Sequence, residues 1–258
     1  MMGGLIWVMP LALIVGVILG ALGGGGAILT VPILVYLLHQ EPVQATAGSL
    51  IIVALASVVG VFAHLSRNNV RFTAGIAFGM IGVVGSFAGS RLSATVAPEV
   101  LMTAFGLLML LVAGLMLRKR AMSNGGGPAT GSRRGPVTLV ATATGVGFLT
   151  GFFGVGGGFA VVPALVLALN YAMPVAVGTS LVVIIVNSLT ALGARATSGI
   201  DIDWPLILVF GAIAAVGSLL GGRVAGRVDP RHLSDAFTVL LFVVAGYVLA
   251  MNVPALLS

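Results

Sequence analysis

Two stretches of this sequence are variants of one pattern: residues 20–38 read GALGGGGAILTVPILVYLL, and residues 151–169 read GFFGVGGGFAVVPALVLAL. Each places a run of glycines before a short apolar segment that contains one proline. The stretches are 131 residues apart, and further matches recur at an offset of 131 or 132. These matches pair Ser49-Leu50 with Ser180-Leu181, GSFAGSRL from Gly85 with GSLLGGRV from Gly217, and Pro98 with Pro230. So many matches at one offset predict a duplicated chain, with homologous halves over residues 1–118 and 137–258.

Composition places the duplicated chain in a membrane. Of its 258 residues, 59% are hydrophobic and only 7% are charged, and its mean hydropathy is +1.21. A soluble domain keeps roughly a quarter of its residues charged. The absence of cysteine excludes disulfides and thiolate metal sites, and we expect no cofactor. The net charge of +6 comes from Lys and Arg in short loops, which indicates membrane anchoring and no binding of nucleic acid.

The apolar segments predict an all-α polytopic protein with about eight membrane helices. Clear spans are expected at 44–64, 72–91, 98–117, 175–195, 204–223 and 231–251. Residues 5–38 and 137–169 are longer than one span needs, since 34 residues of helix would measure about 50 Å against an apolar core of about 30 Å. Glycines interrupt both segments. Each is therefore a hairpin that turns back or one span with a kinked extension.

Positive charge predicts the orientation of the two halves. Residues 119–136 form a polar connector rich in Gly, Ser, Arg and Lys, which we expect on the cytoplasmic side. If each half contains an odd number of spans plus a hairpin, the halves are inverted and the arginine-rich loop at 223–231 is also cytoplasmic. With four full spans per half, that loop would lie outside. The positive-inside rule favours inverted repeats in a bacterial inner membrane, with the N-terminus retained as a membrane segment.

The glycine interruptions are the predicted functional site. A break in a membrane helix frees backbone N–H and C=O groups, which is tolerated where they face protein or a water-filled cavity. The short helices expected at 27–38 and 159–169 begin directly after the breaks, so their positive N-terminal ends would converge on an anion. The predicted substrate-binding residues are Gly24, Gly25, Gly26, Ala27, Ser49, Gly156, Gly157, Gly158, Thr179, Ser180 and Asn187.

Each of these residues also has a simpler interpretation. The glycines alone would let helices pack closely. The hydroxyls of Ser49, Thr179 and Ser180 would bond back to their own helices. Asn187, deep in a span, is either a substrate ligand or an interhelical clasp.

The sequence shows no device for proton coupling. All six carboxylates lie in loops or at the ends of spans, His39 and His232 lie in loops, and His64 ends a span. We therefore expect all three histidines to be interfacial. Efflux of an anion needs no coupled ion, because a negative-inside potential drives each negative charge outward by about 2.3 kcal/mol per 100 mV.

The paired motifs GGGGAILTVP and GVGGGFAVVP, followed by AGSL and GTSL and by GSFAGSRL and GSLLGGRV, make the chain resemble the sulfite exporter TauE/SafE family over nearly its full length. The resemblance implies a bacterial permease that exports sulfite or an organosulfonate such as sulfoacetate. By this resemblance, the substrate-binding site lies around residues 23–27 and 154–158 and includes Ser49, Thr179 and Ser180. Ala27 stands opposite Gly158, and Gly48 opposite Thr179, so the half-sites are unequal and fit one asymmetric substrate site.

Three other functions remain to be weighed against a secondary transporter. A selective anion channel, or a permease for another small anion, would use the same scaffold. An intramembrane serine protease would need a Ser–His pair, and His64 has no paired serine motif in the sequence. A structural assembly factor would gain nothing from broken helices. The oligomeric state is open, with a homodimer as one alternative.

Overall fold

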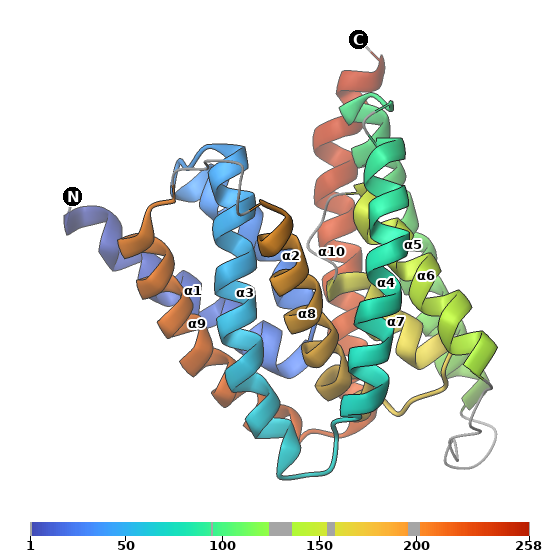
Figure 1. Ribbon diagram of the computed structural model, residues 1–258. Coiled ribbons are helices and arrows are strands. Elements are labelled where there is room, and N and C mark those ends of the chain that lie inside the picture. Colours follow the sequence, from blue (N-terminus) through green and yellow to red (C-terminus); the bar gives the residue numbers. More distant parts are fainter. Residues whose placement is uncertain (1, 94, 124–135, 154–157, 196–201, 258) are drawn as a thin grey trace.

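The computed structural model describes residues 2–93, 95–123, 136–153, 158–195 and 202–257 (Figure 1). Over these residues the chain is helical apart from short connections. The elements are α1 (Met2–Leu22), α2 (Gly25–Pro32), the π-helical η1 (Ile33–Leu37), α3 (Pro42–Leu65), α4 (Phe72–Ser93), α5 (Pro98–Ser123), α6 (Pro136–Phe153), α7 (Gly158–Leu167), α8 (Met173–Arg195), α9 (Trp204–Ala225) and α10 (Pro230–Leu257). The predicted all-α class is confirmed.

The six predicted spans correspond to α3, α4, α5, α8, α9 and α10, each long and apolar enough to cross a membrane. One boundary differs, because α5 continues to Ser123 and makes the first residues of the expected connector helical. Two side chains hold this extension. Lys119 donates to the carbonyl of Val166 and to Oδ1 of Asn170, and Arg120 forms an ion pair with Asp235 of α10.

Helices α1 and α9 are in backbone contact along a glycine seam. A Cβ added to Gly16 would lie 2.1 Å from the carbonyl oxygen of Ala214, and one added to Gly20 would lie 1.9 Å from that of Ser218. α9 presents Gly217 in return, where a Cβ would lie 2.5 Å from the oxygen of Leu13. Glycines four residues apart let membrane helices approach this closely, and dispersion forces then hold them together.

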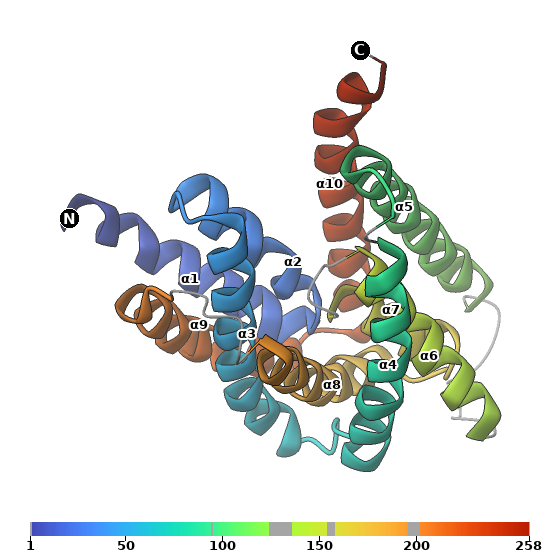
Figure 2. The same ribbon diagram turned by 45° about the horizontal axis from the view of Figure 1, so that its top comes forward.

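The same type of seam joins α4 and α6. A Cβ on Gly147 would lie 2.0 Å from the oxygen of Gly82, and one on Gly151 would lie 2.0 Å from that of Ser86. On α4, a Cβ on Gly85 would lie 2.2 Å from the oxygen of Thr144. Each seam joins a helix from before the connector to a helix from after it. The two halves of the sequence are therefore interleaved rather than separate bundles (Figure 2).

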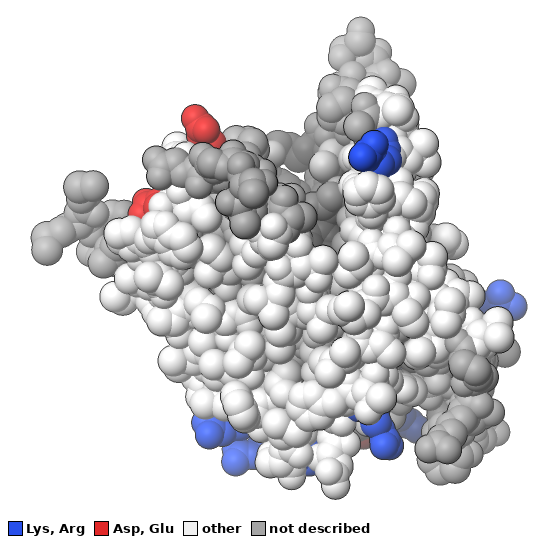
Figure 3. Space-filling view, in the orientation of Figure 1, with Lys and Arg blue, Asp and Glu red and all other residues white. Residues whose placement is uncertain are grey.

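In Figure 3 the clearly visible acidic side chains lie near one end of the molecule, and most of the basic side chains lie near the opposite end. Asp203 caps the start of α9, where its side chain accepts from the amide of Leu206. At the other end of α9, Nη1 of Arg67, from the α3–α4 turn, donates to the carbonyl of Arg223 at 3.3 Å. Helices α3 and α9 thus run in parallel from an acidic end of the molecule to a basic end.

Helix α8 runs in the opposite direction. Oγ1 of Thr179, in its second turn, accepts from the amide of Arg71 at 3.2 Å, and Gly178 lies against the backbone of Asn69. Both partners belong to the turn between α3 and α4, so α8 begins at the basic end. α3 begins at the acidic end. The short helices α2 and α7, which lead into α3 and α8, therefore deliver the chain to opposite ends.

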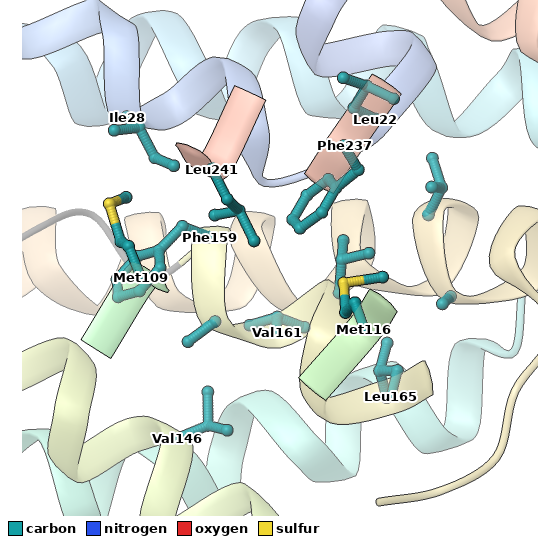
Figure 4. Close-up of a cluster of buried hydrophobic side chains, with 14 of the residues drawn as sticks. Leu22, Ile28, Met109, Met116, Val146, Phe159, Val161, Leu165, Phe237 and Leu241 are labelled. Atoms are coloured by element: carbon teal, nitrogen blue, oxygen red, sulfur yellow. The ribbon is translucent and has the colours of Figure 1, made fainter. Parts of the chain in front are cut away.

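The core surrounds α7, whose residues from Gly158 to Pro163 are all buried. Phe159 packs edge-on against Phe105 of α5, with ring centroids 5.0 Å apart. Met109 from α5 and Leu241 and Phe237 from α10 complete this cluster (Figure 4). A short helix enclosed in this way has its backbone shielded from lipid, as a broken membrane segment requires.

The glycine seams predict unequal effects of the same substitution on one helix. Gly147→Ala forces a methyl group into the backbone of α4 and should lower the free energy of unfolding by roughly 1–3 kcal/mol, the usual cost of overpacking. Gly145→Ala is the matched control, since a Cβ there meets nothing within 4 Å. Unfolding in detergent, followed by circular dichroism, measures both. Equal stability of the two variants would contradict the seam.

Candidate functional site

The first predicted break is present. Helix α1 ends at Leu22, Gly23 adopts φ +68°, and α2 begins at Gly25. A positive φ is cheap for glycine and strained for other residues. The chain then turns back on α1, because a Cβ on Gly26 would lie 2.7 Å from Cα of Leu19. Of the two arrangements left open by the sequence, the hairpin is the one formed here.

The second break lies between α6, which ends at Phe153, and α7, which begins at Gly158. Two of the predicted site residues, Gly156 and Gly157, fall outside the described residues. Gly158 is the first residue of α7 and is buried. α7 has 10 residues, and α2 with η1 has 8 and 5. At 1.5 Å per residue, about 15 and 20 Å, neither short helix crosses the apolar core alone.

The two breaks are in direct contact. A Cβ on Gly24 would lie 1.5 Å from the carbonyl oxygen of Gly158, and a Cβ on Gly158 would lie 2.8 Å from Cα of Gly24. The N-terminal ends of α2 and α7 therefore converge, as the sequence predicted. Gly24 forms the N-cap of α2 without a side-chain cap hydrogen bond. Amides in the first turn of a helix have no partner within it, and here the amide of Gly26 donates back to the carbonyl of Gly23 at 3.4 Å. The positive dipole ends of the two helices meet at this point.

The remaining predicted residues of α2 pack away from this contact. Gly25 faces Leu240 of α10, where a Cβ would lie 2.7 Å from Cδ2. Ala27 is buried in a cluster with Leu19. Their predicted role, which is to offer backbone amides to a substrate, stays a prediction.

Helix α8 passes both breaks. A Cβ on Gly23 would lie 2.3 Å from Oγ of Ser180, and a Cβ on Gly158 would lie 3.0 Å from Cδ1 of Ile184. Asn187 is half-buried, three residues beyond Ile184 on the same helix. Ser180 is thus brought to the first break, and Asn187 lies about one turn beyond the second.

The predicted hydroxyl groups have partners of their own. Oγ of Ser49 donates to the carbonyl of Thr46, and Oγ of Ser180 donates to that of Val177, both at 2.8 Å. This is the back-bonding that the simpler interpretation predicted, and it leaves only lone pairs at these oxygens. Thr179 holds the α3–α4 turn through Arg71. Among the three, Ser180 alone has a described contact with the first break.

One residue near the break was placed wrongly by sequence reasoning. His64 was expected at the interface, but its side chain is 1% exposed, and Nε2 lies 2.8 Å from the carbonyl oxygen of Gly20. Glycines make room for this side chain, since Gly222 of α9 lies against its ring and Gly178 of α8 lies against its Cβ. A histidine in the last turn of an apolar span was the available signal. Only the packing of four helices shows that it is enclosed.

The contact between Gly24 and Gly158 leaves no space for a solute. This arrangement is therefore a closed one, which only a separation of α2 and α7 would open. A cavity of about 210 Å³ lies nearby, bounded by apolar residues such as Ile18, Leu22, Val224 and Leu233 from α1, α9 and α10. Its walls offer a small anion almost no hydrogen-bond donors.

Residues 8–248 match the family described as sulfite exporter TauE/SafE. The chain belongs to this family. A probable membrane transporter protein of Xylella fastidiosa strain 9a5c is 33% identical over 92% of this chain and 91% of its own length. The probable membrane transporter protein YunE of Bacillus subtilis is 27% identical over 91% of this chain and 92% of its own. No solved structure matches the chain significantly. This TauE/SafE protein is thus a multi-pass membrane transporter and not an enzyme.

The left-handed turn at the first break predicts coupled stability effects in this TauE/SafE protein. Gly23→Ala should lower the free energy of unfolding by about 1–2 kcal/mol for the backbone strain, and further for the clash with Ser180. Adding Ser180→Ala removes the clash but not the strain, so a double-mutant cycle should give a coupling energy on the order of 1 kcal/mol. Thermal unfolding of the four proteins measures it. Strict additivity would show that Gly23 and Ser180 do not touch.

Proposed function

We propose that this TauE/SafE protein is a secondary transporter that exports a small sulfur-containing oxyanion across the bacterial inner membrane. Sulfite, or an organosulfonate such as sulfoacetate, is the expected substrate class. The observation that carries the proposal is the contact between Gly24 and Gly158, which brings two helix N-termini together inside the protein. The description of the family supports the choice of sulfur compounds.

The substrate is held mainly by backbone amides. The first turns of α2 and α7 supply them, from Gly24, Gly25 and Gly158, together with Gly156 and Gly157 of the preceding segment. Helix N-termini bind anions through unpaired N–H groups and the positive end of the helix dipole. Ser180 and Asn187 lie on α8 beside the breaks and complete the site when α2 and α7 separate. Transporters built from broken helices commonly hold their substrates in this way.

Inverted repeats give this site its two-sided access. If the two halves are exchanged, α1 corresponds to α6 and α9 corresponds to α4, so the α1–α9 seam corresponds to the α6–α4 seam. In addition, α2 and α7 return the chain to opposite ends of the molecule. His39 and Asn170, 131 residues apart, also share φ values of 55° and 56°. Both features support halves over residues 1–118 and 137–258, joined by a connector. The basic end, with Arg67 and Arg223, faces the cytoplasm, as the positive-inside rule favours.

Charge alone drives export in this scheme. Each negative charge gains about 2.3 kcal/mol per 100 mV on leaving a negative-inside compartment. A dianion gains roughly twice that, so a uniporter suffices. A selective anion channel on the same scaffold is the alternative. The enclosed contact between Gly24 and Gly158 favours a transporter, since it must open and close during each turnover, which limits the rate.

Flux through reconstituted protein tests the proposal. Proteoliposomes are loaded with labelled sulfite, sulfate, sulfoacetate or taurine, and a potential is clamped with potassium and valinomycin. We expect saturable flux of sulfite or sulfoacetate that rises when the loaded compartment is made negative. If none of the four solutes is transported, the proposed substrate class is wrong. If the flux does not change with the membrane potential, the uniport mechanism is wrong.

Glycine variants locate the site in the same assay. Gly25→Val should reduce flux on the order of tenfold or more, because its side chain meets Cδ2 of Leu240 and displaces the first turn of α2. The loss corresponds to one misplaced hydrogen bond to a charged group, worth about 1.5–3 kcal/mol. Gly114→Val is the matched control, because a Cβ at Gly114 meets nothing within 4 Å. Normal flux in a folded Gly25→Val variant would remove the first break from the site.

A further inference from the structure

One ionisable side chain is fully buried among those that the structure describes. His64 is 1% exposed, in the last turn of α3 within a predicted span. The other described Lys, Arg, Asp, Glu and His side chains are exposed or half-buried. An ionisable group enclosed in a membrane segment is costly to keep, so it is a candidate functional group by default.

His64 is tied to the first helix break. Gly20 lies in the last turn of α1, whose final carbonyls have no partner within the helix. Nε2 of His64 lies 2.8 Å from the Gly20 carbonyl oxygen. Because a carbonyl only accepts, Nε2 carries the hydrogen. Nδ1 of the neutral ring is then a bare acceptor, and it has no hydrogen-bond partner in the described part of the chain.

Two buried hydroxyl groups lie in the same packing region. Ser57 and Gly60 precede His64 on one face of α3, at spacings of seven and four residues. Oγ of Ser218, on α9, lies 2.4 Å from where a Cβ of Gly60 would be. Both Ser57 and Ser218 are fully buried, and among the described residues neither hydroxyl oxygen has a hydrogen-bond partner. Such groups are normally satisfied by water, which would also carry a proton.

The charged residues on the described segments that pack against His64 are all basic, and they include Arg71 just before α4. Arg67 follows it in the α3–α4 turn, and Arg223 follows Gly222 on α9. The described part of α1 contributes no ionisable side chain, and α8 contributes none before Arg195. A proton on Nδ1 would create a buried cation without a carboxylate beside it. The closed arrangement therefore disfavours the charged ring, whereas a bound anion would supply the missing countercharge.

We propose that His64 is a proton-binding site of this transporter, and that the proton bound there promotes entry of the anion between the two helix breaks. The inference rests on the proposed function and adds a regulator to its site. Histidine changes charge between about pH 5 and 8. Binding of proton and anion is reciprocal, so each favours the other by the same factor.

The titration of His64 can be observed directly. The chain has three histidines, so the His39→Asn/His232→Gln variant, labelled with ¹⁵N-histidine, gives NMR signals from His64 alone. Asparagine suits position 39 because it tolerates the positive φ there. We expect the Nε2–H tautomer near pH 8, and more imidazolium at about pH 6.5 with sulfoacetate than without it. A ring that stays neutral down to about pH 5 with the anion present, or an anion without effect, would overturn the proposal.

Flux of sulfoacetate supplies the second measurement, since its sulfonate group stays ionised over this range. Wild-type flux should rise up to about tenfold per unit as pH falls at the basic end, as expected for one proton. His64→Gln keeps an N–H donor for Gly20 but cannot titrate, so its flux should be low and independent of pH. His39→Asn should retain the wild-type profile. Unchanged pH dependence in His64→Gln would overturn the proposal.

The two proposals fail in different ways. Absence of flux for every sulfur anion at every pH contradicts the proposed substrate, while the NMR titration still tests the proton site without any transport. A variant that does not fold is recognised by its elution profile in detergent. In that case the single-histidine protein, which keeps His64, Ser57 and Ser218 intact, decides the question.

Discussion

The structure depends on one constraint: backbone groups freed by a break in a membrane helix must find partners inside the protein. At the end of α1 the constraint is met from both sides. Nε2 of His64 lies at hydrogen-bond distance from the Gly20 carbonyl, and Gly24 at the start of α2 lies against Gly158 at the start of α7. The first break is therefore enclosed by other helices, among them α3, α8 and α10. Two helix N-termini gathered at one point favour a negatively charged solute, and this is the basis of the proposed anion substrate.

In lipid the hydrophobic effect does not drive helices together, so this enclosure depends on the close approach of helix backbones. Helices in lipid gain little from burying apolar side chains, so their association relies on dense packing. The α1–α9 and α4–α6 seams provide it through glycines against carbonyl oxygens. Because each seam joins the two halves of the sequence, the halves cannot move as separate bodies. Opening the site must therefore involve α2 and α7, whose contact through Gly24 and Gly158 is narrow.

Local signals in the sequence were sufficient for the helices and the breaks. Apolar length predicted the six spans, and consecutive glycines predicted the breaks at Gly23–Gly24 and before Gly158. Which helix faces which could not be read, because glycine seams form between segments such as α1 and α9 that lie far apart in sequence. The same limit hid His64, whose burial depends on small residues of three other helices. The hydrogen bond that Thr179 accepts from the amide of Arg71 could not be read either, since Arg71 belongs to a distant turn.

Anomalous diffraction from crystals soaked in selenite, an isostere of sulfite, would test the central claim most directly. A selenium peak within hydrogen-bond distance of the first amides of α2 and α7, with Gly24 and Gly158 moved apart, is the predicted result. A peak at another place in the protein, with these two glycines still in contact, would show that the helix breaks are structural and that the anion is held elsewhere.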